Sequence, residues 1–189
     1  MGMVKLWEGR QRGYQWLGAA LAAVVMPVVI YQGGMARETV VVGTLFLLLV
    51  VLTVTDLKSM LMPNRIVFPA FGVLLVLRFA LQPELWREAL AGLVVGGLIL
   101  TLLGLCSNGM GGGDVKVFAL IGLVVGVKGV LFAIFYSSLY GTLIGLPLRW
   151  TGRIKPRQHI PFGPFILLGT LTAWACGDRI WHWYLMQLS

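Results

Sequence analysis

Two aspartates, Asp56 and Asp114, are the residues of this sequence best suited to chemistry, because each lies at the boundary of a long apolar run. A carboxylate at membrane depth is costly, and it is a functional candidate by default. Two carboxylates that lie close together cannot both ionise readily, so such a pair holds a single proton. This state supports aspartic peptidase chemistry, in which the ionised member takes a proton from water and the protonated member polarises the peptide carbonyl.

Separate roles at two helix ends are the alternative for these acids. Aspartate is a good N-cap, and Asp114 could cap a helix that begins at Val115. A lysine, Lys58 or Lys116, follows each acid two positions later and on a helix points about 200° away from it. We interpret both lysines as anchors at the inner membrane surface.

Three glycines, Gly111, Gly112 and Gly113, directly precede Asp114. They allow the backbone to adopt positive φ and allow another backbone to approach closely. A peptidase needs such space to accept an extended substrate beside its catalytic acid. A phosphate-binding loop would normally continue with a GK[ST] pattern, which is absent, and a plain glycine loop between two helices stays possible.

Long apolar runs must position these acids. The chain of 189 residues is 58% hydrophobic and 12% charged, whereas soluble domains carry roughly twice that charged share. We therefore predict an all-α, polytopic membrane protein with about 6–7 transmembrane helices of roughly 20 residues each. The candidate segments are Tyr14–Tyr31, Thr39–Thr55, Ile66–Leu81, Ala89–Cys106, Val115–Val127, Gly129–Leu148 and Ile160–Cys176.

The fifth of these segments, Val115–Val127, is too short to span a membrane alone. It is expected to start within the glycine-rich stretch or to stay shallow. The chain then divides into a cytoplasmic N-terminal segment (1–13), a transmembrane domain (14–176) and an interfacial C-terminal segment (177–189). The first segment could instead be a cleaved signal peptide that ends near Gly34–Ala36.

The basic residues indicate the orientation. With the N-terminus in the cytoplasm, ten lysines and arginines lie inside and four outside, a clear positive-inside bias that places the protein in the inner membrane with both acids at the cytoplasmic face. The net charge of +8 is therefore a topology signal, and no nucleic-acid partner is expected. The inside residues are Lys5, Arg10, Arg12, Lys58, Arg65, Lys116, Arg149, Arg153, Lys155 and Arg157, and the outside residues are Arg37, Arg87, Lys128 and Arg179.

The two cysteines, Cys106 and Cys176, exclude a four-thiolate zinc site within one chain, and we expect no metal. They are expected on opposite sides of the membrane, so no disulfide is predicted. A lone loop histidine such as His159 is usually solvated, and a carboxylate pair needs no imidazole.

Three motifs at helix boundaries occur in a fixed order: Asp56 followed by "MPN" at Met62–Asn64, "GMGGGDVK" ending at Lys116, and "IPFGP" at Ile160–Pro164. Together they resemble the type IV prepilin peptidases, which are polytopic membrane aspartyl peptidases of the GxGD class. The resemblance extends from about Thr39 to Cys176.

The resemblance implies that Asp56 and Asp114 are the catalytic pair of an endopeptidase that needs no cofactor. It implies a type IV prepilin or pseudopilin-like substrate of a pilus or type II secretion system, cleaved at the cytoplasmic face after a glycine, where a short basic leader precedes an apolar helix. Pro161 and Pro164 suit a helix start, and Gly163 permits close packing. The supporting motif residues are Gly111, Gly113, Lys116, Pro63, Asn64, Phe162, Gly163 and Pro164.

One departure from the family concerns methylation. Many bacterial members carry a cytoplasmic domain with two CxxC pairs that N-methylates the new amino terminus, whereas this sequence has only Gln32–Glu38 between its first two helices and no CxxC. We therefore expect peptidase activity without methylation, zinc or S-adenosylmethionine.

Two rival readings remain. A small proton- or ion-coupled transporter would use Asp56 and Asp114 as relay groups, but it does not explain the PN and PFGP motifs. A non-catalytic assembly factor is disfavoured by the intact acids. The expected partners other than substrate are membrane lipids.

Overall fold

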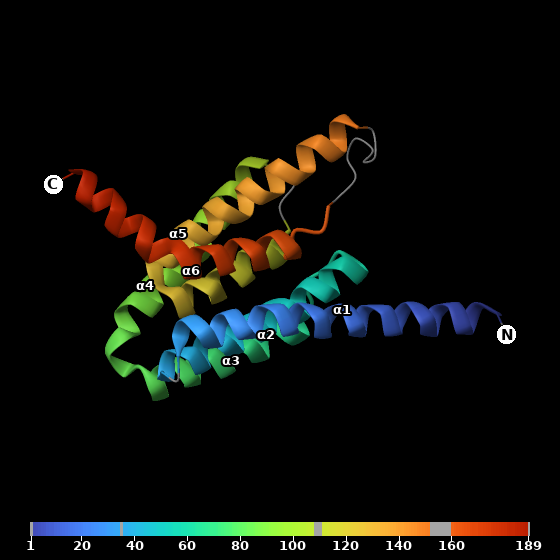
Figure 1. Cartoon of the computed structure of the whole chain (residues 1–189), viewed down its shortest axis with the longest axis horizontal. Coiled ribbons are helices and arrows are strands. Elements are labelled where there is room, and N and C mark those ends of the chain that lie inside the picture. The colour runs from blue at the N-terminus through green and yellow to red at the C-terminus, as the bar shows by residue number, and fades with distance from the viewer. Residues whose placement is uncertain (1, 35, 108–110, 152–159, 189) are drawn as a thin grey trace.

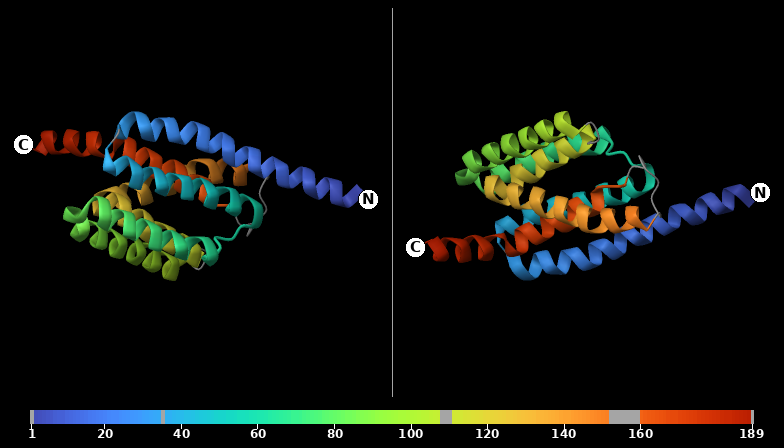
Figure 2. Two further views of the ribbon diagram at one scale, coloured as in Figure 1. Left: turned by 90° about the horizontal axis from the view of Figure 1, so that it is seen from below. Right: turned by 90° about the horizontal axis from the view of Figure 1, so that it is seen from above.

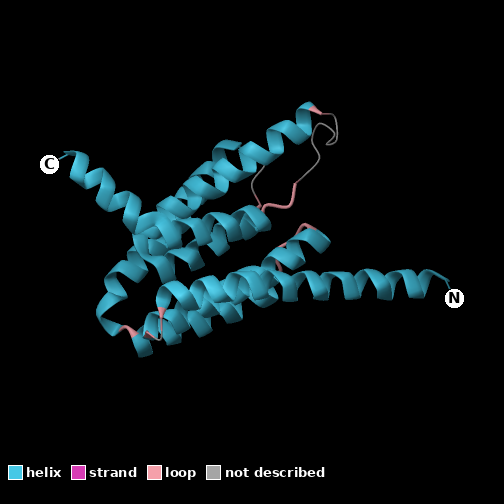
Figure 3. Cartoon of the chain, viewed as in Figure 1, coloured by secondary structure: helices cyan, strands magenta, loops and turns pink. Residues whose placement is uncertain are grey.

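The computed structural model describes residues 2–34, 36–107, 111–151 and 160–188, and every regular element in these ranges is helical. The elements in chain order are α1 (Gly2–Gly33), α2 (Arg37–Ser59), α3 (Asn64–Leu81), the 3₁₀ turn η1 (Pro83–Leu85), α4 (Trp86–Ser107), α5 (Gly112–Trp150) and α6 (Gly163–Leu188). The predicted all-α class is confirmed, as Figure 3 shows.

The lengths and compositions of the helices fit a multi-pass membrane protein. Five helical stretches are long and apolar enough to cross a bilayer, and the apolar part of α6, Gly163–Gly177, is shorter. The five stretches are Gly13–Gly33, Arg37–Ser59, Asn64–Leu81, Pro83–Cys106 and Gly112–Leu148. The predicted polytopic architecture is therefore confirmed.

The longest helix, α5, consists of two arms that meet at Gly126, where φ is 72° and ψ is −175°. A Cβ placed on Gly96 of α4 would lie 2.5 Å from the Phe118 carbonyl oxygen and 2.9 Å from Val130 Cγ2. Phe118 and Val130 would be about 18 Å apart on a straight helix, so both can approach Gly96 only if the chain turns back between them. Figure 2 shows this reversal.

The two arms of α5 correspond to the separately predicted segments Val115–Val127 and Gly129–Leu148. The first arm starts at Gly112, within the glycine-rich stretch, as expected for so short a segment. It is about 21 Å long at 1.5 Å per residue, less than the ~30 Å hydrocarbon thickness.

The helices form two groups that pack against each other, α1–α3 and α4–α6 (Figure 1). Within the groups α1 contacts α2, α2 contacts α3, and α5 contacts both α4 and α6, while α2–α6 and α3–α5 contacts join the groups. Glycine permits the closest approach: a Cβ on Gly92 of α4 would lie 2.2 Å from the carbonyl oxygen of Gly122 on α5. Small residues at such crossings are typical of membrane helix packing.

One end of the bundle carries the start of α1, the α2–α3 connection, the ends of α4 and α5, and the starts of α5 and α6 (Figure 1). Both predicted acids and all three motifs therefore belong to this end. The opposite end carries the α1–α2 and α3–α4 connections, the Gly126 reversal and the C-terminus.

The described residues at both ends of the chain are helical. Helix α1 begins at Gly2 rather than near Tyr14, and α6 continues to Leu188, so the described parts of the predicted end segments continue the neighbouring helices. Their positions relative to the membrane remain predictions. Arg153, Lys155, Arg157 and His159, which figured in the sequence predictions, lie outside the described residues.

Candidate active site

Asp56 lies in the last turn of α2, where its side chain is only 6% exposed. The helix ends four residues later at Met60, which adopts a left-handed conformation and donates its N–H to the Asp56 carbonyl oxygen. The acid is therefore fixed in a regular helix just before the chain turns toward α3.

The first residue of α6 contacts this buried acid. The N–H of Gly163 donates to Oδ2 of Asp56 over 2.7 Å, and the hydroxyl of Thr53, one turn earlier on α2, donates to the Gly163 carbonyl oxygen over 3.2 Å. A Cβ on Gly163 would lie 3.0 Å from Asp56 Oδ2 and 3.1 Å from the Thr53 Cα. The close packing predicted at Gly163 is thus present, and its partner is the carboxylate itself.

Asp114 approaches the same place from α5. It is partly buried in the first turn of that helix, and its N–H donates to the Gly111 carbonyl oxygen over 3.0 Å. It belongs to the same end of the bundle as Asp56, because the start of α5 packs against the α2–α3 connection. The alternative that Asp114 is the N-cap of a helix beginning at Val115 is wrong, because α5 begins at Gly112.

The glycines before Asp114 do not use their freedom to adopt positive φ, since the described glycines with positive φ are Gly34 and Gly126. Gly112 and Gly113 instead start a helix. The close neighbour at Gly113 is a side chain rather than another backbone: a Cβ there would lie 2.8 Å from the Cβ of Met62 in the α2–α3 connection.

Lys116 and Asn64 join two of the sequence motifs. The Lys116 ammonium donates to Oδ1 of Asn64 over 2.7 Å and lies 5.2 Å from the centre of the Phe68 ring. Lys58 is exposed on α2, so the two lysines that follow the aspartates have different surroundings. Our sequence reasoning treated both as membrane anchors and missed the Lys116–Asn64 contact, although both residues belong to motifs already singled out.

The remaining motif residues shape the helix starts. Pro63 is the residue before α3, with φ −70° and an extended ψ, and Pro164 lies in the first turn of α6, where a missing N–H costs nothing. Phe162 packs edge-on against Phe165, and a Cβ on Gly141 of α5 would lie 3.0 Å from the Phe162 ring. These contacts hold the start of α6 between α2 and α5.

The described residues contain no group of three or more histidine, cysteine or acidic side chains that could hold a metal ion. Cys106 and Cys176 are both free, as predicted.

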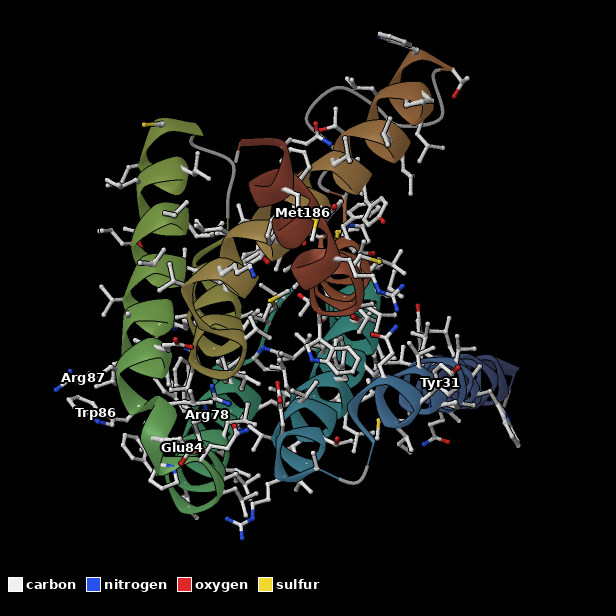
Figure 4. The ribbon with its side chains drawn as sticks, turned by 60° about the vertical axis from the view of Figure 1, so that its left-hand side comes forward. Tyr31, Arg78, Glu84, Trp86, Arg87 and Met186 are labelled. Carbon is white, nitrogen blue, oxygen red and sulfur yellow. The ribbon has the colours of Figure 1, made fainter. Side chains whose placement is uncertain are left out.

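A second polar cluster lies at the opposite end of the bundle and was not predicted. Arg78 of α3 is buried, and its guanidinium donates to the Gln82 side chain. Glu38 and Glu88 interact with it electrostatically. It lines a cavity of about 610 Å³ beside the Gly126 reversal. Figure 4 shows Arg78 inside the bundle and Trp86 and Arg87 on its outside. Arg78 lies in the last turn of α3, whereas Asp56 comes just before α3 begins, so the cluster and this acid lie at opposite ends of α3.

Comparisons with known proteins agree with this architecture. Residues 43–146 match the model of the type IV leader peptidase family. A Bacillus subtilis (strain 168) protein named prepilin leader peptidase/N-methyltransferase is 40% identical over 139 residues, which is 73% of this chain and 56% of the relative. Proteins of the same name from Aeromonas salmonicida (strain A449) and Neisseria gonorrhoeae are 31% and 26% identical over 97% and 87% of the chain, and over 68% and 59% of their own lengths.

The chain thus spans between about half and two thirds of the length of these curated relatives. No solved structure matches it significantly.

Proposed function

The chain belongs to the type IV leader peptidase family, and from this premise we propose that it removes the leader from type IV prepilin-like proteins by aspartic chemistry at Asp56 and Asp114. The relatives named above are prepilin leader peptidases, which supports this substrate class. Asp56 and Asp114 are the residues proposed to act on the scissile peptide bond.

The observation that carries the proposal is the meeting of two acids from different helices at one end of an apolar bundle. Asp56 lies in the last turn of α2 and Asp114 in the first turn of α5, and the start of α5 packs against the α2–α3 connection. Close carboxyl groups share one proton, so one member can activate water while the other polarises the carbonyl of the scissile bond. The supporting contacts of Gly163 and Lys116 fix the helix ends around them.

The proposed site of cleavage is the cytoplasmic face of the inner membrane. The N-terminus and both acids belong to the same end of the bundle (Figure 1), and basic residues concentrate in the segments of that end. A substrate whose basic leader precedes an apolar helix would place its junction at this depth, with its helix in the lipid beside the protein.

We further propose that these 189 residues remove the leader without methylating the product. The connection between α1 and α2 comprises residues 34–36, and the two cysteines are 70 positions apart rather than in CxxC pairs. Mass spectrometry of the product formed in the presence of S-adenosylmethionine tests this point. An added methyl group on the new N-terminus would contradict it.

The decisive experiment is cleavage of a full-length prepilin-like protein by the reconstituted chain. We expect Asp56→Asn and Asp114→Asn each to lower the rate of cleavage by about 10³-fold or more. The reason is that one acid must activate water and the other must polarise the carbonyl, so neither can replace the other. Asp178→Asn, which changes the remaining aspartate, is the matched control and should cleave at the normal rate.

N-terminal sequencing of the product then locates the cleaved bond. Cleavage that survives both substitutions would remove the peptidase proposal. Loss of a proton or ion flux in these variants, with no cleavage by the unaltered protein, would favour the transporter instead.

A further inference from the structure

We propose that the two aspartates have fixed and different roles: Asp56 is the ionised base, Asp114 is the acid that carries the proton, and Gly163 is the positioning residue that makes the difference. This inference rests on the proposed peptidase function and deepens it. It concerns which carboxyl group holds the single proton before the substrate is attacked.

A hydrogen bond from the start of α6 favours the ionised form of Asp56. The Gly163 N–H donates to Asp56 Oδ2 over 2.7 Å in a buried setting. A hydrogen bond from a backbone N–H favours the charged form of a carboxylate, and burial strengthens the interaction. The carboxylate of Asp56 thus has a fixed donor before any substrate arrives.

The N-terminal end of α6 faces Asp56. Gly163 is the first residue of a 26-residue helix, so its N–H is one of the unpaired groups at the positive end of the helix dipole. The first turn of α6 contains no acidic residue that could compete for this position. Asp56, which comes from another helix, therefore serves as the anion at the N-terminus of α6.

Asp114 has a different environment. It lies within the first turn of its own helix, but none of the described hydrogen bonds ends on its carboxyl oxygens. The Lys116 ammonium, two positions after Asp114, donates to Asn64. Since one carboxyl of the pair must hold the proton, the member without a fixed donor is the one that carries it.

The contact between position 163 and Asp56 requires glycine. A Cβ would lie 3.0 Å from Asp56 Oδ2, 3.1 Å from Asp56 Cβ and 3.1 Å from the Thr53 Cα, so a larger residue would push α6 away from α2. The Thr53 hydroxyl donates to the carbonyl oxygen of the same glycine and fixes its peptide from the other side. The PFGP motif thereby positions the proposed catalytic acid Asp56, in addition to packing α6 against α2.

The roles give a balanced reaction. Asp56 takes a proton from water as the water oxygen bonds to the scissile carbonyl carbon, and Asp114 gives its proton to the carbonyl oxygen. The resulting gem-diol then collapses: Asp56 gives its proton to the leaving nitrogen as the C–N bond breaks, and Asp114 takes back a proton from a gem-diol hydroxyl. Both acids return to their starting states, and one water is consumed.

The test is a direct observation of the proton. The chain has three aspartates, so carboxyl-¹³C labelling of aspartate in the detergent-solubilised full chain gives three signals. Asp56→Asn, Asp114→Asn and Asp178→Asn identify them by removing one signal each. At the pH of the cleavage assay we expect the Asp56 signal at the ionised position and the Asp114 signal at the protonated position.

Gly163→Ala tests the cause. We expect the Asp56 signal to move toward the protonated position and kcat to fall about 10- to 100-fold, with KM changed less than about twofold. Gly72→Ala is the matched control, because a Cβ at Gly72 meets no atom within 4 Å, and it should change neither the signals nor kcat. Thr53→Val, which removes the second contact without adding bulk, should act in the same direction with a loss of about 2- to 10-fold.

A proton found on Asp56, or signals that show both acids ionised or equally protonated, would overturn the assignment. Unchanged Asp56 signals in folded Gly163→Ala or Thr53→Val protein would overturn the role of Gly163. The signals are recorded without substrate, so failure of the unaltered chain to cleave prepilin would count against the proposed function and not against this distribution of the proton.

Discussion

At the scale of single residues, Asp56 is an acid in a nearly inaccessible position, 6% exposed at the end of an apolar helix. Burying an unpaired charge costs several kcal/mol, so such a residue needs a partner. Its partner is not a basic side chain but the Gly163 N–H, which a side chain at that position would displace. This explains why a motif of small and apolar residues belongs to the same site as the acids.

Lys116 provides a second prediction at this scale. Lys116→Met removes the donor to Asn64 and leaves the start of α3 less firmly held against α5, so we expect kcat/KM for prepilin cleavage to fall about 5- to 20-fold. Arg65→Met is the matched control, since Arg65 is an exposed cation directly after Asn64 in the first turn of α3. Removal of an exposed charge changes stability by about 0–1 kcal/mol, so its effect should be clearly smaller. Equal losses in the two variants would contradict a specific role for the Lys116–Asn64 contact.

At the scale of helices, Gly126 decides how α5 is used. Without the reversal, α5 would be a single rod of 39 residues, about 58 Å long and far longer than the membrane is thick. With it, the first arm packs on α4 and the second arm packs on α6, so that both the start of α5 and the start of α6 lie at the end of the bundle that holds Asp56. The start of α6 lies beside Asp56 because the chain turns back here.

We therefore predict a stability effect at Gly126. The combination of φ 72° and ψ −175° is almost exclusive to glycine, and Gly126→Ala should destabilise the fold by about 1–3 kcal/mol. The loss should appear as a lower apparent Tm in detergent. Gly97→Ala, whose Cβ would make an ordinary 3.4 Å contact with Ala119, should leave Tm nearly unchanged. An unaltered Tm in Gly126→Ala would show that the reversal does not depend on glycine.

At the scale of the whole molecule, the polar groups are separated between two ends. One end holds the aspartate pair with Gly163, Lys116 and Asn64, and the other holds buried Arg78 with Gln82 and the cavity beside Gly126. The length between them is apolar and faces either lipid or neighbouring helices. The polar contacts therefore lie near the two membrane surfaces, where the charges that set the orientation of the protein in the membrane also lie.

The orientation can be tested with a residue that the chain already has. Cys106 is exposed near the end of α4, at the same end of the bundle as the two acids. In a Cys176→Ser background, a membrane-impermeant thiol reagent should label Cys106 in inside-out vesicles and not in intact cells. Cys106→Ser in the same background is the control for non-specific labelling. Labelling from the outside alone would place the active site on the other face.

Much of the fold could be predicted because membrane helices follow from local composition. Apolar runs long enough to span a bilayer identified α1 to α4, and the break between two short runs anticipated the reversal within α5. The alternative of an N-cap at Asp114 was wrong because α5 starts earlier than the apolar run does. Helix ends depend on backbone hydrogen bonds, which hydropathy does not record.

The sequence by itself determined the helical class, the membrane setting and the two acids at apolar boundaries, because the transfer of side chains into lipid is nearly additive along the chain. The tertiary structure decided the contacts that give those acids different surroundings: Gly163 with Asp56 across 107 positions, Lys116 with Asn64 across 52, and the buried Arg78 cluster. Such contacts depend on which faces of the helices pack together. Lipid-facing and partner-facing surfaces are both apolar in a membrane protein, so the sequence pattern alone does not distinguish them.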